Sequence, residues 1–213
     1  MRTSDKNFFA KEGFVILAVS FVCMLVLMRV NSFAAFLAFA WLGFCFYFFR
    51  NPKRETALDD GAIVSPADGT ILSIGEAEEI HFLHETMMRV SVFMSPFNVN
   101  VNRVPETGEV VEAKHYDGQF LTAYNEKAGE QNERHAVHLK TKDGQDLVFV
   151  QVAGWLARRI VNYARQGDLL NRGEIVGVIK FGSRVDVYLP KGYTVAVQLK
   201  QKVKAGETII AKR

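Results

Sequence analysis

The chain opens with two long apolar stretches. Gly13–Met28 and Phe33–Phe49 contain no charged residue and are separated by a polar turn at 29–32. Each run falls slightly short of the roughly 20 residues that cross a bilayer comfortably. Because neither run has a polar face, the pattern predicts a membrane-associated helical hairpin within residues 1–54 rather than a buried core hairpin. A cleaved signal peptide would account for the first run only.

Basic residues flank the predicted hairpin at both outer ends. They are Arg2, Lys6 and Lys11 before it, and Arg50, Lys53 and Arg54 after it. Because positive flanks stay on the cytoplasmic side of a membrane, we expect a protein of the cell membrane whose second domain, 55–213, faces the cytoplasm.

The second domain has a different pattern, in which short runs of alternating apolar and polar residues are separated by turns. The runs are Thr70–Ile74, Met88–Met94, Glu109–Tyr116, Ala136–Thr141, Leu147–Val152, Glu174–Ile179, Arg184–Leu189 and Thr194–Leu199. Asp-Gly pairs such as Asp143-Gly144 mark several of the turns. The pattern predicts a mainly β fold, a compact antiparallel body of barrel-sandwich type with one or two short helices. The clearest helical stretch is Trp155–Ala164, whose apolar residues recur near one face.

Composition excludes several kinds of site. Cys23 and Cys45 both lie in the apolar runs, so we expect neither a disulfide nor a thiolate metal cluster in the second domain. His81 and His84 lack a third ligand motif. His135 and His138 are three apart in an expected strand and should point to opposite faces, so no metal site is expected for either pair. A net charge of +3 gives no nucleic-acid footprint.

Three segments of the second domain could carry chemistry. The first, 65–70, contains Asp68 before a glycine, which alone predicts a plain turn. The second, 93–105, has asparagines at three alternate positions, which predicts one polar face of an extended strand with Arg103 beside it. The third is Gly182-Ser183, which interrupts a run of β-branched and aromatic residues and alone predicts a β-bulge or a tight turn. Glycine tolerates backbone geometries that bring its carbonyl within reach of the next hydroxyl.

Taken together, in this order and spacing, the segments resemble phosphatidylserine decarboxylase in its short bacterial and archaeal form. The segments 132–134 and 154–160 also resemble that family, and the resemblance extends from about Gly61 to Arg213. The N-terminal hairpin fits it too. The resemblance implies a membrane-bound carboxy-lyase that converts phosphatidylserine in the membrane to phosphatidylethanolamine.

The family makes its own cofactor, and the resemblance implies self-cleavage at Gly182–Ser183 into chains 1–182 and 183–213 that remain together as a heterodimer. The Ser183 hydroxyl attacks the Gly182 carbonyl to give an ester. Elimination would release the first chain and leave dehydroalanine, and addition of water would then release ammonia and give a pyruvoyl group. Its carbonyl forms a Schiff base with the substrate amine and delocalises the electron pair left when carbon dioxide departs.

One position departs from the family pattern. The family usually has histidine where this chain has Asn100, and that histidine is thought to help Asp68 activate the serine or to handle protons during decarboxylation. Asparagine takes up no proton at neutral pH. Three explanations stay open: a natural variant that uses Asp68 or another histidine, a slow processor, or a substitution that traps the precursor. Arg103 and Arg184 are expected to bind substrate, by charge and position.

Two other functions compete with this interpretation. A non-catalytic module of the biotinyl/lipoyl barrel-sandwich type on a membrane anchor would suit the segments 61–66 and 203–207, but no carrier lysine of Met-Lys-Met type occurs at a hairpin tip. A serine hydrolase would suit a reactive Ser183, but the G-x-S-x-G pattern of a nucleophile elbow is absent around it.

Overall fold

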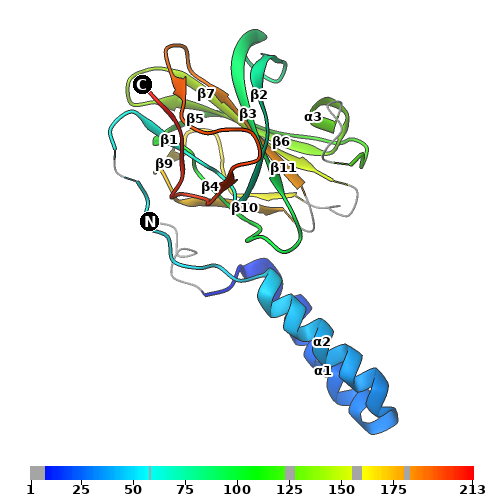
Figure 1. Cartoon of the computed structure of the whole chain (residues 1–213). Coiled ribbons are helices and arrows are strands. Elements are labelled where there is room, and N and C mark those ends of the chain that lie inside the picture. Colours follow the sequence, from blue (N-terminus) through cyan, green and yellow to red (C-terminus); the bar gives the residue numbers. More distant parts are fainter. Residues whose placement is uncertain (1–7, 58, 123–127, 155–159, 180–182) are drawn as a thin grey trace. The chain divides into compact units, whose positions relative to one another are not determined.

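The chain forms two compact units, Met1–Lys53 and Arg54–Arg213. The computed structural model describes residues 8–57, 59–122, 128–154, 160–179 and 183–213 (Figure 1).

The first unit is a helical hairpin. A 3-10 turn, η2 (Lys11–Gly13), leads into α1 (Phe14–Val30), and α2 (Ser32–Phe48) follows after a single residue. That residue, Asn31, caps α2, because its Oδ1 accepts hydrogen bonds from the backbone N–H groups of Phe33 and Ala34 at 2.9 and 3.0 Å. The two predicted helices are therefore present, with limits shifted by one or two residues.

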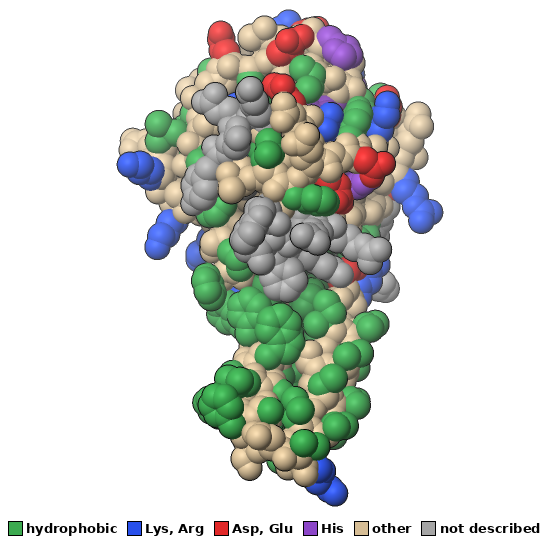
Figure 2. All heavy atoms as spheres, turned by 90° about the vertical axis from the view of Figure 1, so that its right-hand side faces the viewer, with side chains coloured by type: hydrophobic (Ala, Val, Ile, Leu, Met, Phe, Trp, Pro, Cys, Tyr) green, Lys and Arg blue, Asp and Glu red, His purple; other side chains and the backbone are tan. Residues whose placement is uncertain are grey.

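The outer surface of the hairpin is apolar. Leu17, Leu42 and Cys45 pack between the helices, while other large side chains, such as Val15 and Phe36, are 73% and 65% exposed. Figure 2 shows hydrophobic side chains over the visible face of the helices. The segment Lys11–Val30, with a mean hydropathy of 2.5, is long and apolar enough to cross a membrane, whereas α2 is shorter.

The second unit is built from antiparallel strands, as predicted, and the described part contains one short helix, α3 (Ala128–Gln131). The strands are β1 (Ala62–Val64), β2 (Gly69–Glu79), β3 (Glu85–Met94), β4 (Val101–Arg103), β5 (Gly108–Tyr116), β6 (Arg134–Thr141), β7 (Asp146–Ala153), β8 (Ile160–Asn162), β9 (Leu169–Leu170), β10 (Ile175–Ile179), β11 (Ser183–Leu189), β12 (Thr194–Val195), β13 (Lys202–Val203) and β14 (Ile209–Lys212).

These strands form three sheets. The largest, in the order β13-β2-β3-β11-β7-β6-β5-β9, curls into a half-barrel. Two three-stranded sheets, β4-β10-β8 and β1-β14-β12, complete the unit. Because β14 pairs with β1, the C-terminus lies beside the start of the domain, where Arg213 N donates to Gly61 O at 3.1 Å.

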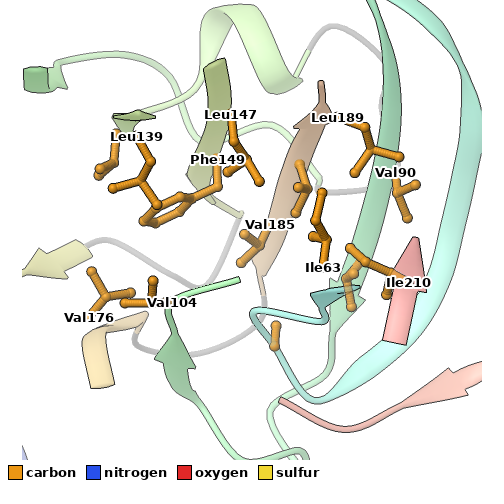
Figure 3. Close-up of a cluster of buried hydrophobic side chains, with 14 of the residues drawn as sticks. Ile63, Val90, Val104, Leu139, Leu147, Phe149, Val176, Val185, Leu189 and Ile210 are labelled. Atoms are coloured by element: carbon orange, nitrogen blue, oxygen red, sulfur yellow. The ribbon is translucent and has the colours of Figure 1, made fainter. Parts of the chain in front are cut away.

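The main core lies on the inner face of the half-barrel. Val185 of β11 and Phe149 of β7 belong to the same buried cluster as Ile63 and Ile210, which come from the smaller sheet β1-β14-β12 (Figure 3). A second buried cluster, around Val148 and its neighbours in β7 and β11, covers the other face of the same sheet. The middle strands are therefore buried on both faces, which explains their near-continuous apolar sequences.

One predicted element is wrong. Residues 160–162 of the expected helix Trp155–Ala164 form strand β8, which pairs with β10, and 155–159 lie outside the described residues. The apolar spacing of a short run cannot distinguish a helix from a buried strand, and here Ile160 and Val161, both β-branched, favour the pairing with Ile179 and Val178.

Candidate active site

Ser183 is the first residue of β11 and is fully buried. It lies between two neighbouring strands, opposite Met94 of β3 and Ala153 of β7. Its hydroxyl donates to the Met94 sulfur at 3.4 Å. A thioether is a weak acceptor and no base, so this contact leaves the proton on the hydroxyl. Gly182, the other half of the predicted cleavage site, lies outside the described residues.

Asn100 lies beside Ile179, the last residue of β10. Its carbonyl accepts the backbone N–H of Ile179 at 3.2 Å, and its side chain is buried. Nδ2 donates to the Asn98 carbonyl at 2.9 Å, whereas Oδ1 has no hydrogen-bond partner among the described residues. A buried amide oxygen without a partner is costly, so this position is suboptimal for asparagine in the precursor.

The three alternate asparagines do not form the expected polar face of one strand. Only Asn102 belongs to β4, whereas Asn98 closes a turn, with its Oδ1 accepting both the N–H and the hydroxyl of Ser95 at 2.9 Å. The reason is local, because asparagine side chains bond readily to backbone groups a few residues away and so favour turns over extended strands.

Asp68 is held by two partners that the sequence did not indicate. Arg54 Nη2 donates to Oδ2 at 2.7 Å, and the backbone N–H of Ala205 donates to Oδ1 at 2.8 Å. The sequence pattern puts Arg54 in the basic flank of the hairpin, but its side chain is only 8% exposed. Arg54 is 14 residues and Ala205 is 137 residues from Asp68 along the sequence, so no local pattern identifies these two pairings.

The three predicted segments nevertheless converge. Thr70, Phe93 and Arg184 lie side by side on β2, β3 and β11, so Asp68 and Ser183 belong to the same end of three adjacent strands. The backbone N–H of Arg103 donates to the Pro66 carbonyl at 2.8 Å, which joins β4 to the Asp68 turn. Among the described residues, Asp68 makes no hydrogen bond to Asn100 or to Ser183.

The two arginines expected to bind substrate are both buried, and each already bonds to another group of the protein. Arg103 Nη1 donates to the Gly173 carbonyl at 2.8 Å. Arg184 is paired with Asp186 through Nη2 and Oδ2 at 2.9 Å. Because successive residues of a strand point to opposite faces, the Arg184 side chain lies on the other face of the sheet from that of Ser183. Their binding of substrate stays a prediction.

His115 of β5 and His135 of β6 lie opposite each other on neighbouring strands. His135 is directly opposite Gln151 of β7, and its ring lies 5.9 Å from that of His115. Burial, reinforced by the neighbouring His115, lowers the pKa of His135 to about 4, so this ring is neutral at pH 7. His138 points to the opposite face, as predicted, and bonds to Asp146 at 2.8 Å.

Comparison with known proteins decides the family. The family model described as phosphatidylserine decarboxylase matches residues 41–211. The chain belongs to the phosphatidylserine decarboxylase family. It is similar to a phosphatidylserine decarboxylase proenzyme from Geotalea uraniireducens (strain Rf4), with 46% identity over 94% of each chain. A proenzyme of the same name from Syntrophus aciditrophicus (strain SB) is 42% identical over 95% of this chain and 96% of its own.

A third relative has a similar level of identity. A phosphatidylserine decarboxylase proenzyme from Rickettsia akari (strain Hartford) is 41% identical over 94% of this chain and 88% of its own. As a member of the phosphatidylserine decarboxylase family, the chain is an enzyme of the carboxy-lyase class. The family match favours this class over the carrier-module and serine-hydrolase alternatives.

Proposed function

We propose that the chain is a precursor that cleaves itself between Gly182 and Ser183 and then decarboxylates phosphatidylserine to phosphatidylethanolamine. The observation that carries this proposal is the position of Ser183, fully buried at the first residue of β11, in a member of this family. A hydroxyl that bonds only weakly to a thioether keeps its oxygen lone pairs available to attack a carbonyl.

The proposed cofactor is a pyruvoyl group formed from Ser183. The residues around the serine fit such a group, because a small carbonyl group replaces a small hydroxyl side chain beside the polarisable Met94 sulfur. When formed, the group supplies an electrophilic carbonyl that takes up the electron pair left by carbon dioxide. The surrounding strands exclude water from Ser183, which is 0% exposed.

We infer that the two products of cleavage stay together. β11 pairs with β3 on one side and β7 on the other, and its seven residues are all buried. β14, also in the fragment 183–213, pairs with β1. Because removal of the fragment would expose both cores, we expect a heterodimer of 1–182 and 183–213 that separates only on unfolding.

We also place the enzyme in the cell membrane with its second domain in the cytoplasm. The apolar outer surface of the hairpin supports a membrane location, and Lys11, Arg50 and Lys53 at its outer ends support the orientation. A hairpin in the bilayer keeps the domain at the surface where a phospholipid substrate resides.

The test compares the parent chain with Ser183→Ala by intact-mass analysis and by carbon dioxide release from phosphatidylserine vesicles. Alanine has no hydroxyl to attack Gly182, so we expect Ser183→Ala to stay whole and inactive. Ser91→Ala is the matched control, because Ser91 is equally buried in the neighbouring strand β3 and should process like the parent. Decarboxylation by Ser183→Ala would contradict the proposal.

A further inference from the structure

A chain of buried side-chain amides leads to Ser183. Asn162 Nδ2 donates to Gln151 Oε1 at 2.7 Å, and Gln151 Nε2 donates to Asn102 Oδ1 at 2.8 Å. Asn102 Nδ2 then donates to Met94 Sδ at 3.4 Å, the same sulfur that accepts the Ser183 hydroxyl. Asn102, Gln151, Met94 and Ser183 are each 0% exposed. We call Asn162, Gln151 and Asn102, ending on Met94, the amide chain.

Both ends fix the direction of the amide chain. At the outer end, Asn162 Oδ1 accepts the backbone N–H of Ala164 at 2.7 Å, which leaves only its NH₂ group to face Gln151. At the inner end, the Met94 sulfur carries no proton, so only the NH₂ group of Asn102 can bond to it. Each internal amide therefore uses one donor and one acceptor, and a single orientation satisfies all of them.

The amide chain joins the small sheet to the half-barrel. Its members lie on β8, β7 and β4, and it ends on β3, next to β11. Strand β10 makes room for it, because a Cβ atom at Gly177 would lie 2.2 Å from the Val161 carbonyl oxygen and 2.9 Å from Gln151 Nε2. A side chain at position 177 would thus displace either β8 or the middle of the amide chain.

We propose that the amide chain positions the Ser183 hydroxyl for self-cleavage, which makes Gln151, Asn102 and Asn162 positioning residues of the reaction. The inference rests on the proposed cleavage. The amide chain fixes the Met94 sulfur, and the sulfur fixes the direction of the O–H bond without binding it strongly. The oxygen lone pairs then point away from the sulfur. A misplacement of about 1 Å can cost 10²-fold in rate, so loss of the amide chain slows cleavage.

The test replaces the middle amide by Gln151→Glu. At pH 8 the introduced carboxylate accepts from Asn162 but cannot donate to Asn102, so we expect cleavage to be at least about tenfold slower than in the parent. Burial favours the protonated form of a carboxyl group, whose O–H can donate to Asn102. The rate should therefore return toward that of the parent as the pH falls to about 5. Intact-mass time courses of the parent and of Gln151→Glu over this pH range give the ratio of their cleavage rates at each pH.

Two further variants separate positioning from loss of stability. Val148→Ala truncates a fully buried side chain on the same strand as Gln151 but on its other face, and it should cleave at the rate of the parent. Asn162→Asp, at the partly buried outer end, keeps the acceptor for Ala164 and loses the donor to Gln151. We expect slower cleavage that also recovers at low pH, even if Gln151→Glu fails to fold.

The outcomes distinguish the two proposals. If Gln151→Glu and Val148→Ala lose equal thermal stability and cleave at equal rates, the amide chain has no positioning role and the proposed function stands. If Gln151→Glu cleaves slowly and its rate does not recover at low pH, the positioning role is also overturned. The lost hydrogen bond would then not be the cause of the slow cleavage. A parent chain that is never cut, even with Asn100→His, overturns cleavage and positioning together.

Discussion

At the scale of single residues, the site depends on polar groups whose partners are distant in sequence. Asp68 contacts Arg54 and Ala205, and Asn102 contacts Gln151. The motifs made Ser183, Asp68 and Asn100 candidates, and their roles stay predictions. The sequence could not indicate Arg54 or Gln151, because each pairs with its partner only after the sheets have formed. Arg54 had even been given a different role, as a topology signal beside the membrane.

Asn100→His should accelerate cleavage. An imidazole can accept the serine proton and asparagine cannot, and general-base help is commonly worth about 10²–10⁴-fold. The unpartnered Oδ1 of Asn100 shows that replacing the amide removes no hydrogen bond of that oxygen in the described part of the chain. A time course of the fragments 1–182 and 183–213 measures the effect.

The second substitution, Asp68→Asn, should undo the gain, because the carboxylate that would stabilise the imidazolium is lost. If the parent is fully cut after expression and Asn100→His changes no rate, another group supplies the base. His135, with a pKa of about 4, is then a weak candidate at neutral pH, and His115 and His138 are the first to mutate.

At the scale of elements, alternation and turn residues predicted most of the half-barrel. The runs that became β2, β3, β5, β6, β7, β10 and β11 were all found, because each is a strand of ordinary length bounded by a turn. Gly144 has a φ of 71°, which favours glycine, and this explains why the pair Asp143-Gly144 predicts the turn. Short β8 was missed, and only two residues of Thr194–Leu199 form a strand, because pairing partners decide such short segments.

The turn between β2 and β3 carries a pH-dependent contribution to stability. Burial alone would raise the pKa of the Glu79 carboxyl, but hydrogen bonds from the His81 ring and from the backbone N–H groups of Leu83, Phe82 and His81 outweigh it and lower the pKa from 4.5 to about 2. Because the folded-state pKa is depressed, this stabilisation is complete above about pH 4.5 and is lost as the pH falls toward 2. It amounts to roughly 3 kcal/mol.

We therefore expect Glu79→Gln to lower the melting temperature at pH 7 and to flatten its decline between pH 5 and 2. Glu85→Gln serves as the control, since Glu85 forms an exposed ion pair with Lys191, and its loss should change stability by less than about 1 kcal/mol. Thermal melts of the three chains across this pH range check the prediction. Parallel pH profiles for Glu79→Gln and the parent would refute the role of this carboxylate.

At the scale of the whole molecule, the enzyme combines an apolar hairpin with a β domain whose proposed cut precedes a central strand. We predict that the N-terminus and Asp60 lie on the same side of the membrane, because two helices joined by the single residue Asn31 return the chain to its starting side. Labelling of Ser4→Cys and Asp60→Cys in sealed vesicles, each in a chain whose Cys23 and Cys45 are replaced by alanine, tests this. Labelling of the two positions from opposite sides would contradict the hairpin topology.

The pairing of β14 with β1 has a consequence for engineering. Because the last residue of the chain lies beside Gly61, a circular permutant can begin at Ser183, pass through Arg213 and a flexible linker into residue 54, and end at 182. In this permutant Ser183 would be the N-terminal residue and would carry an ordinary amino group instead of a ketone. Such a molecule would have the break in the backbone but not the carbonyl group. It would therefore show how the break alone affects the fold, separately from the effect of the carbonyl group on the reaction.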